Sequence, residues 1–333
     1  MSINGVRKNI ITSWRKTAGR LLIAKNWGQE SLLPIQNVCG LGKHSMDNKI
    51  KVSLSNTAET MLQSFYARAQ YSLNPKHKFY DAKAVEIVNK IDYNFSKAEK
   101  DRTMSGGVLA RTIVFDELVG DFIAQNPGCT VVNIACGLDT RVYRVDNGKL
   151  RWYNLDLPEV IELRDQLFRE TGRISTIGIS ALDSSWADKV EAQGAVLFII
   201  EGLTMYLTAE EVGTLLGIIR DNFSRATVMM ECISPVWIAK QGVEKSIAET
   251  GAKFKWGANS FDELGSIGNG FHKVKDDNIL RGMATIQPIY HIFSKLPLAK
   301  KITQKILIFE RNKAWEGANM SKQASEFQGW CSE

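Results

Sequence analysis

The sequence is poor in the residues that build metal centres and disulfide frameworks. Its 333 residues include five cysteines, none in a CxxC pair, and four histidines scattered along the chain. An odd number of isolated cysteines is typical of a reducing compartment, and neither residue type has the spacing of a zinc site. We therefore expect no metal centre and a cytoplasmic location.

Long apolar runs are also lacking, because no stretch approaches the roughly 20 residues that a membrane-spanning helix needs. We expect no integral membrane segment. The formal net charge is +6, and residues 1–30 carry +5 of it, since they hold six basic residues and a single acid, Glu30. The remaining chain is close to neutral, which argues against nucleic acid as a partner.

Residues 1–48 differ in composition from the rest of the chain. Within them, VRKNIITSWRKTAGRLLIAKNW has no acid and has apolar residues at helical spacing. We interpret this basic amphipathic extension as an extra helix covering the domain, with a transit peptide or a membrane-surface helix as the alternatives. Residues 49–311 are predicted to form the main domain, and the polar residues 312–333 a tail.

Strand and helix patterns alternate from residue 130 onward. Predicted strands are 130–134, 151–157, 173–180, 195–203, 226–233, 271–277 and 304–311; predicted helices are 56–71, 81–91, 106–126, 158–171, 184–193 and 209–223. Thr208 and Glu211 predict a capping box for the last of these helices. The alternation predicts an α/β fold, with a doubly wound, mostly parallel seven-stranded sheet behind N-terminal helices. Residues 234–270 interrupt it, and we interpret them as a lid insertion.

The turn after the first strand, ACGLDTR, has only part of the glycine fingerprint of a dinucleotide site. A pyrophosphate site needs G-x-G-x-x-G, whereas here Gly137 stands alone, with Ala135 and Thr140 at the other two positions. Asp156 follows Gly137 by 19 residues and ends the next strand, the spacing of a carboxylate that accepts ribose hydroxyls. A cofactor with ribose and no phosphate fits both observations, and S-adenosylmethionine is such a molecule. An ordinary tight turn beside a strand-end aspartate is the alternative.

Six sequence blocks make this interpretation more specific. They are, in chain order, AETMLQSFYARA, ARTIVFDELV, GLDTR, YNLDLPEVIELR, ALDSSW and EGLTMYLTAEEV. Together they resemble the leucine carboxyl methyltransferase family, including its bacterial polyketide O-methyltransferase branch, from about residue 50 to 310. Ala135 departs from the family pattern, in which glycine is commoner.

The resemblance implies a Rossmann-like methyltransferase fold and S-adenosylmethionine as the cofactor. It implies methyl transfer to a carboxylate or hydroxyl of a small polyketide-like or aromatic molecule. The alternative acceptor within the same family is the carboxy-terminal leucine of a protein. The oligomeric state is not predicted.

The resemblance also assigns the cofactor contacts. Arg111 is expected to hold the methionine carboxylate, a task suited to a guanidinium fork. Glu201 ends an apolar strand, where a carboxylate is costly without a partner, and is expected to take the ammonium. Gly137 admits the cofactor to the backbone, and Asp156 accepts the ribose hydroxyls. Asp183 is either the adenine neighbour or the cap of the following helix.

The acceptor side is assigned to four residues. Tyr206 is expected to line the methyl-transfer channel as the catalytic residue, with core packing as the alternative. Tyr66 and Arg68 either close the site or pack their helix. For a phenol, the candidate base is a tyrosine, a glutamate or a lid histidine such as His272. No histidine falls within the six blocks, which favours a carboxylate acceptor, already ionised at neutral pH.

Two other classes of protein compete with this interpretation. A nicotinamide-dependent reductase requires the missing third glycine, and a non-catalytic binding module does not require the cofactor residues to be intact. Asp139 and Arg141 are expected to pair and hold the turn. Asp156→Ala is expected to weaken cofactor binding and leave the fold intact, since a strand end faces solvent.

Overall fold

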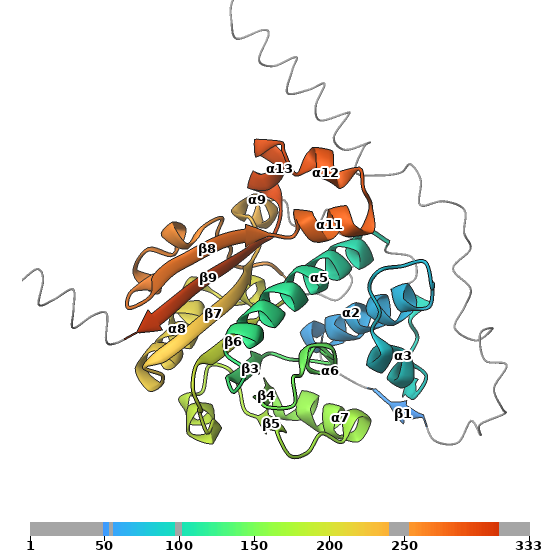
Figure 1. The fold of residues 1–333 in the computed structure, drawn as a ribbon, viewed down its shortest axis with the longest axis horizontal. Coiled ribbons are helices and arrows are strands. Elements are labelled where there is room, and N and C mark those ends of the chain that lie inside the picture. The colour runs from blue at the N-terminus through green and yellow to red at the C-terminus, as the bar shows by residue number, and fades with distance from the viewer. Residues whose placement is uncertain (1–48, 53–55, 97–101, 240–252, 313–333) are drawn as a thin grey trace, which may run out of the picture. The chain divides into compact units, whose positions relative to one another are not determined.

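The structure is a computed structural model that describes residues 49–52, 56–96, 102–239 and 253–312 (Figure 1). The strands are β1 (Ile50–Lys51), β2 (Ile91–Asp92), β3 (Thr130–Ile134), β4 (Arg151–Asp156), β5 (Ile174–Gly178), β6 (Val196–Ile200), β7 (Arg225–Cys232), β8 (His272–Asn278) and β9 (Lys305–Asn312). The α-helices are α2 (Asn56–Ser72), α3 (Ala82–Val88), α5 (Arg102–Gln125), α6 (Val142–Val145), α7 (Pro158–Phe168), α8 (Ala209–Asn222), α9 (Pro235–Ile238), α11 (Leu280–Ile286), α12 (Tyr290–Phe293) and α13 (Pro297–Ile302). Short 3₁₀ helices are η3 (Ser184–Lys189), η4 (Thr204–Tyr206) and η5 (Phe261–Gly268).

Seven strands form one twisted sheet in the order β5-β4-β3-β6-β7-β9-β8. All neighbouring pairs from β5 to β7 are parallel, and β9 runs antiparallel to both β7 and β8. The predicted doubly wound, mostly parallel sheet of seven strands is therefore confirmed. The chain leaves β3 toward β4 on one side and returns to β6 on the other, so the sheet has a switch point between β3 and β6, where such folds bind ligands.

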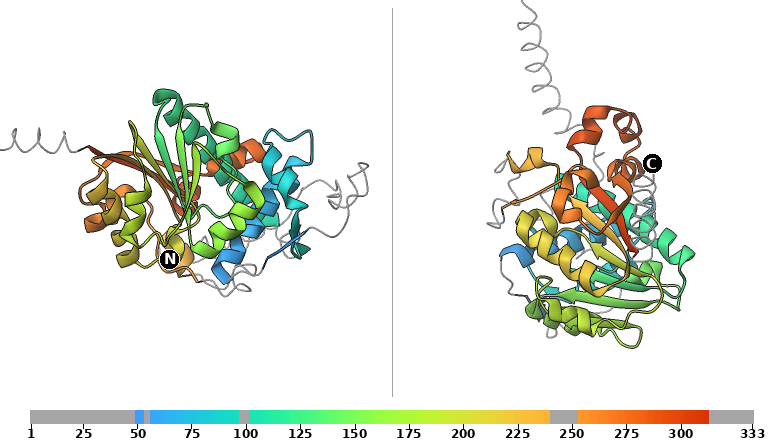
Figure 2. Two further views of the ribbon diagram at one scale, coloured as in Figure 1. Left: turned by 90° about the horizontal axis from the view of Figure 1, so that it is seen from below. Right: turned by 90° about the vertical axis from the view of Figure 1, so that its left-hand side faces the viewer.

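Helices cover both faces of the sheet (Figure 2). On one face, α8, η3 and η5 bury Leu215, Trp186 and Leu264 against strand residues such as Phe198. On the other face, α5 buries Phe115 among a second set of strand residues. Central strands read as continuous apolar runs because both of their faces are covered. The N-terminal helices α2 and α3 pack together, and α2 packs on α5.

The start of α8 is fixed by the predicted capping box. The Thr208 hydroxyl accepts the Glu211 backbone N–H at 3.2 Å, and the Glu211 carboxylate accepts the Thr208 N–H at 2.7 Å. Both N–H groups lie in the first turn, where a helix offers no partner of its own. The prediction from the sequence is confirmed.

Thr208→Ala is therefore expected to lower the free energy of unfolding by about 1 kcal/mol, the usual cost of losing such a cap. Urea unfolding followed by circular dichroism measures the change. Thr214→Ala, which removes an exposed hydroxyl bonded to the Glu210 carbonyl within the same helix, is the matched control. An equal loss in both variants would contradict a specific role for the cap.

Three details differ from the sequence-based expectations. Ser184–Lys189 form a 3₁₀ helix, and β6 ends at Ile200, before the predicted limit of 203. A two-stranded parallel sheet, β1 with β2, has no sequence signal because each strand has two residues. Of the predicted insertion 234–270, residues 240–252 lie outside the described ranges, as do the predicted segment 1–48 and residues 313–333 of the predicted tail 312–333; Asn312 ends β9.

Candidate functional site

Strand register brings the predicted cofactor residues to one edge of the sheet. Ile134 is level with Leu155 on β4 and with Ile200 on β6, and Ile200 is level with Met230 on β7. The next residues along these strands are therefore neighbours at the carboxyl edge. They are the turn from residue 135, Asp156, Glu201 and Glu231. This is the edge at which open α/β sheets bind ligands.

The turn after β3 has two residues in the left-handed region, Ala135 with φ 52° and Gly137 with φ 49°. A non-glycine residue there is unfavourable by about 1–2 kcal/mol, so Ala135 adopts a conformation for which the family's commoner glycine is better suited. At Gly137 a side chain would be strained by the positive φ and crowded, since an added Cβ would lie 3.1 Å from the Cβ of Met61. The bare backbone of Gly137 thus faces α2 at close range.

Asp156 braces this turn. Its Oδ2 accepts the Gly137 N–H at 2.7 Å, and its Oδ1 accepts the Leu157 N–H at 2.8 Å. Burial raises the pKa of Asp156, although both backbone donors act to lower it. Truncation to alanine would leave the partly buried Gly137 N–H and the exposed Leu157 N–H without this acceptor, so Asp156 supports the turn; that Asp156→Ala leaves the fold intact stays a prediction.

A second brace comes from Arg164 on α7, whose side chain is fully buried. Its Nη1 donates to the carbonyls of Gly137 and Asp139, each at 2.9 Å. Its Nε and Nη2 donate to the Glu170 carboxylate at 2.9 and 2.7 Å. One guanidinium thereby fixes both the turn and the end of α7.

Arg111 and Glu201, the predicted partners of an amino-acid zwitterion, are paired with each other. Arg111 Nε lies 2.7 Å from Glu201 Oε1, and Arg111 Nη1 lies 3.2 Å from Glu231 Oε2. The Glu201 side chain also accepts from Arg141 Nη2 at 2.6 Å. Arg111 and Glu201 are 14% and 13% exposed, whereas Glu231 is fully buried. A ligand entering from solvent thus meets Arg111 and Glu201 and not Glu231.

Burial raises the pKa of Glu231, because a carboxylate loses its hydration there. Burial acts on Glu201 in the same direction, yet Arg141 and Arg111 together lower the pKa of Glu201. Glu201 is therefore held as an ionised carboxylate. Glu231 also accepts the Gly202 N–H at 2.7 Å, which ties the ends of β6 and β7 together.

Further ion pairs join these residues into one arginine–carboxylate network. Its members are Arg68, Arg111, Arg141 and Arg144 with Asp81, Asp116, Asp139, Glu201 and Glu231. Arg141 is 1% exposed and contacts three carboxylates at 2.6–2.8 Å, so it is the hub of the network. The expected pairing of Asp139 with Arg141 is confirmed at 2.8 Å.

The network has five carboxylates and four guanidinium groups, so it carries one net negative charge when all are ionised. S-adenosylmethionine has a carboxylate, an ammonium and a sulfonium, and so carries one net positive charge. A dinucleotide brings a diphosphate instead, which this edge would repel. The charge of the site thus fits S-adenosylmethionine.

Arg68 and Tyr66 of α2 have structural partners. Arg68 is buried and donates to Asp81 at 3.1 Å and to the Leu138 carbonyl at 2.8 Å. Tyr66 stacks on Phe95, with ring centroids 4.4 Å apart. These contacts agree with a helix-packing role for both residues. A role for them in closing the acceptor site stays a prediction.

The other predicted residues lie in different surroundings. Asp183 accepts the Ser185 N–H at 2.9 Å and caps η3, which is the capping alternative; an adenine contact stays a prediction. Tyr206 ends η4, and its ring lies 5.9 Å from that of Phe254.

The structure does not bring His272 to this site. His272 is level with Glu310, which is level with Thr227 at the start of β7, whereas Glu231 stands at the end of the same strand. Because β8 is parallel to β7, His272 lies at the opposite edge of the sheet. The prediction that His272 belongs to the site is therefore wrong.

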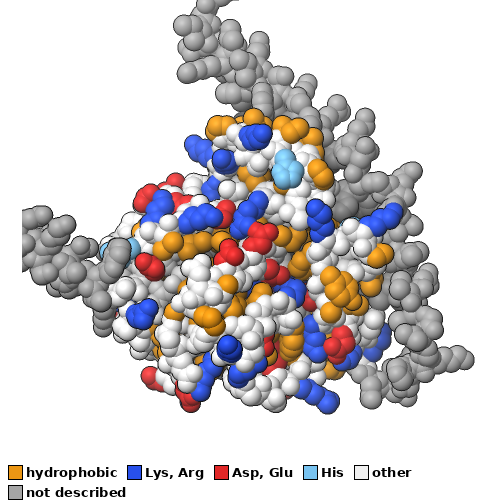
Figure 3. All heavy atoms as spheres, viewed as in Figure 1, with side chains coloured by type: hydrophobic (Ala, Val, Ile, Leu, Met, Phe, Trp, Pro, Cys, Tyr) orange, Lys and Arg blue, Asp and Glu red, His pale blue; other side chains and the backbone are white. Residues whose placement is uncertain are grey.

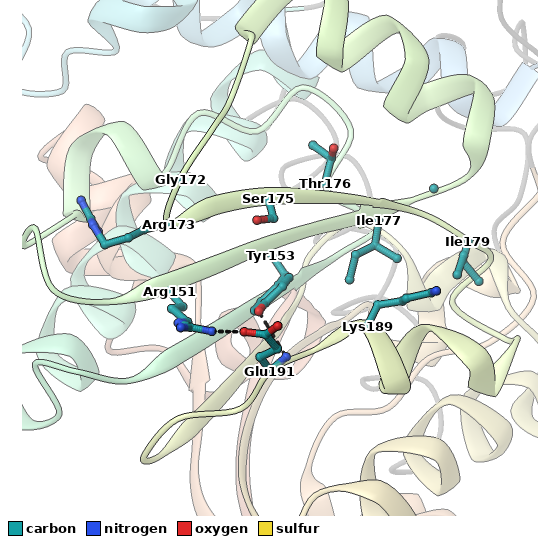
Figure 4. A pocket seen from close by; sticks show the side chains of 11 residues that line it. Arg151, Tyr153, Gly172, Arg173, Ser175, Thr176, Ile177, Ile179, Lys189 and Glu191 are labelled. Atoms are coloured by element: carbon teal, nitrogen blue, oxygen red, sulfur yellow. Dashed lines mark hydrogen bonds and ion pairs between the residues drawn. The ribbon is translucent and has the colours of Figure 1, made fainter.

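A cavity of about 700 Å³ opens over β4 and β5 (Figure 4). Its lining includes Arg151, Tyr153, Lys189 and Glu191, and Arg151 forms an ion pair with Glu191. The Glu191 N–H donates to the Tyr153 hydroxyl at 3.1 Å. None of the residues that line it belongs to the arginine–carboxylate network, but Gly178 of the lining is level with Asp156 on β4.

The fold is of the Rossmann-like methyltransferase class, and comparisons with known proteins agree. A solved protein of the DUF574 family from Streptomyces avermitilis is similar with a TM-score of 0.51 and 13% identity, covering 76% of this chain and 97% of that one. This likeness supports the fold alone.

Sequence comparison is more specific. Residues 53–220 match the sequence profile of the leucine carboxyl methyltransferase family. The chain is 33% identical over 210 residues to the tetracenomycin polyketide synthesis O-methyltransferase TcmP of Streptomyces glaucescens, covering 62% of this chain and 77% of that one. It is 34% identical over 193 residues to the S-adenosyl-L-methionine-dependent methyltransferase dpfgK of Gibberella zeae, covering 53% of this chain and 64% of that one.

The chain belongs to the leucine carboxyl methyltransferase family. It is an S-adenosylmethionine-dependent O-methyltransferase, as its sequence blocks predict. In the described ranges, no helix is both long and apolar enough to cross a bilayer.

The sequence analysis did not identify Glu231, which pairs with Arg111, or Arg164, which donates to the turn after β3. Glu231 follows an apolar run in ATVMMEC, the same signal that identified Glu201, and so was within reach of the pattern. Arg164 lies on a helix among polar residues, where nothing in the sequence distinguishes a buried arginine from a surface one.

Proposed function

We propose that this enzyme methylates an oxygen of a small polyketide-type acceptor and that Arg111, Glu201, Gly137 and Asp156 hold its cofactor. The observation that supports these roles is the Arg111–Glu201 pair, partly exposed and next to the turn that Asp156 braces. Arg111 would bind the methionine carboxylate and Glu201 the ammonium. Asp156 would accept the ribose hydroxyls beside the bare backbone of Gly137.

The Arg111–Glu201 ion pair can be replaced by ion pairs with the amino-acid part of the cofactor at little cost. An amino-acid zwitterion placed between Arg111 and Glu201 replaces one ion pair with two. Glu231 and Arg141 keep their contacts with Arg111 and Glu201 during the exchange, so neither charged side chain is left without a partner. Buried charges that lose all partners are costly, and this arrangement avoids that cost.

Methyl transfer requires positioning more than acid–base chemistry. When bound, S-adenosylmethionine supplies an electrophilic methyl group on a sulfonium sulfur. The residues of the site would hold the amino-acid part and the ribose of the cofactor. The acceptor oxygen could then approach the methyl group from the side opposite the sulfur. Alignment of this kind is worth effective molarities of roughly 10⁵–10⁸ M. Tyr206, in η4 directly after β6, is our candidate for lining the approach.

A carboxylate is the acceptor that these residues support best. His272 lies at the far edge of the sheet, and a carboxylate with a pKa near 4 needs no base at neutral pH. A phenol with a pKa near 10 is about 0.1% ionised at pH 7 and would need one. TcmP, the relative that acts in polyketide synthesis, supports an acceptor of polyketide type.

Transfer of labelled methyl from S-adenosylmethionine tests this proposal. Aromatic polyketide acids are expected to be methylated at a rate that changes little between pH 6 and 9. A rate that rises tenfold per pH unit would indicate a phenol acceptor. Transfer only to a phosphatase carboxy-terminal peptide would replace the small-molecule proposal with a protein leucine acceptor.

Asp156→Asn tests the ribose contact. It keeps the side-chain volume and removes the charge, so the affinity for S-adenosylmethionine is expected to fall roughly 10–100-fold, the value of one hydrogen bond to a charged group. Isothermal titration calorimetry measures the dissociation constant. Asp165→Asn, on the exposed side of α7, is the control. Unchanged affinity in Asp156→Asn would show that the ribose does not contact this carboxylate.

A further inference from the structure

The connection between β8 and β9 carries an exposed apolar surface. Four aliphatic side chains of α12, α13 and their flanks are exposed by 39–64%: Ile289, Ile292, Leu296 and Leu298. Three exposed lysines belong to the same segment: Lys295 lies between Ile292 and Leu296, and Lys300 and Lys301 follow Leu298. We call these seven residues the α12–α13 surface. Figure 3 shows apolar and basic side chains together over these helices, at the top of the view.

The α12–α13 surface has an excess of positive charge. Residues 278–309 contain no aspartate or glutamate. Within the described ranges, no carboxylate lies within salt-bridge distance of Lys295, Lys300 or Lys301. Arg281 of α11 differs, because it is paired with Glu117 and Asp277. The lysine charges are therefore available to an external anion.

This surface lies at the same edge of the sheet as the cofactor residues. The α11–α13 segment follows Asn278 at the end of β8, which is level with Lys305 and hence with Cys232 at the end of β7. α11 packs against α5 so closely that a Cβ on Gly282 would lie 2.0 Å from the carbonyl oxygen of Ala110, the neighbour of Arg111. The surface is thus linked through α11 to α5, the helix that carries Arg111.

Aliphatic side chains and unpaired lysines on one short segment suit the boundary between lipid head groups and acyl chains. The apolar side chains enter the boundary, and the lysines contact anionic head groups. A nucleic acid would use the lysines and leave the aliphatic side chains in water, so charge and apolarity together favour a lipid surface.

We propose that the α12–α13 surface binds the surface of an anionic lipid bilayer. In this arrangement the carboxyl edge of the sheet lies on the side of the bilayer. This inference does not depend on the identity of the methyl acceptor.

Vesicle sedimentation with the full chain tests it. The protein is expected to sediment with vesicles that contain phosphatidylglycerol, to remain in solution with phosphatidylcholine alone, and to be released by salt. Lys300→Glu with Lys301→Glu should weaken the partition at least about fivefold per lysine. Ile292→Ser with Leu298→Ser should also weaken it, at an unchanged slope with salt.

Matched controls lie elsewhere on the surface. Lys78→Glu with Lys149→Glu changes the net charge equally, and Val274→Ser removes an apolar side chain that is 54% exposed on β8. Equal loss in the controls, or no sedimentation of the unaltered chain with anionic vesicles, would overturn the proposal. So would light scattering that shows self-association abolished by Ile292→Ser with Leu298→Ser, which would make this surface an interface between copies of the chain.

Discussion

Arg164→Met is expected to lower the free energy of unfolding by about 3–5 kcal/mol, the cost of leaving one member of a buried ion pair alone. Glu170, 1% exposed, would lose its guanidinium partner. The carbonyls of Gly137 and Asp139 would lose their donor as well. At about 2–4 °C per kcal/mol, the midpoint of thermal unfolding should fall by roughly 6–20 °C.

Arg173→Met provides the matched control. Arg173 forms an ion pair with Asp146 at 2.9 Å, but its side chain is 42% exposed, and exposed pairs contribute about 0–1 kcal/mol. Differential scanning calorimetry compares the two variants. Adding Glu170→Gln to Arg164→Met should restore part of the loss, because it removes the uncompensated charge. Equal stability of Arg164→Met and Arg173→Met would show that the turn does not depend on this brace.

Arg111→Met is expected to reduce the affinity for S-adenosylmethionine by at least about 100-fold. The methionine carboxylate would lose a forked donor, and two charge-assisted hydrogen bonds are together worth about 3 kcal/mol or more. Arg111→Lys keeps the charge and loses the fork, so its affinity should fall between those of the unaltered chain and Arg111→Met. Titration calorimetry gives the dissociation constants.

The control separates cofactor binding from folding. Arg220→Met removes an arginine paired with Asp221 at the exposed end of α8 and should leave the affinity unchanged. Circular dichroism at the titration temperature verifies that each variant is folded. If folded Arg111→Met bound S-adenosylmethionine as tightly as the unaltered chain, the carboxylate would have to be held elsewhere.

The sequence alone was sufficient for the main architecture. Apolar runs such as VLFII and TVVNI predict strands buried on both faces, and Thr208 with Glu211 marks a helix start that the structure confirms. The same reading placed the Gly137 turn, Asp156 and Glu201 at strand ends. Parallel pairing then brings these ends together, because parallel strands share their carboxyl edge.

The contacts between distant residues could not be predicted in this way. Arg111 and Glu231 are 120 residues apart, and Arg141 and Asp116 are 25 apart, so a single sequence gives no sign that they pair. The prediction for His272 was wrong for a related reason, since a strand pattern does not show which end of the strand lies at the site. Asp156 was expected to face solvent because its backbone partners are invisible before folding.

The surplus negative charge of the arginine–carboxylate network has a consequence for turnover. The methyl donor enters with one net positive charge, and once the methyl is gone the spent thioether is a neutral zwitterion. If the network holds the methyl donor as proposed, its charge would attract the donor more strongly than the demethylated product, by electrostatics that salt would weaken. In the proposed site, the positive charge lost in the reaction would thus favour release of the product.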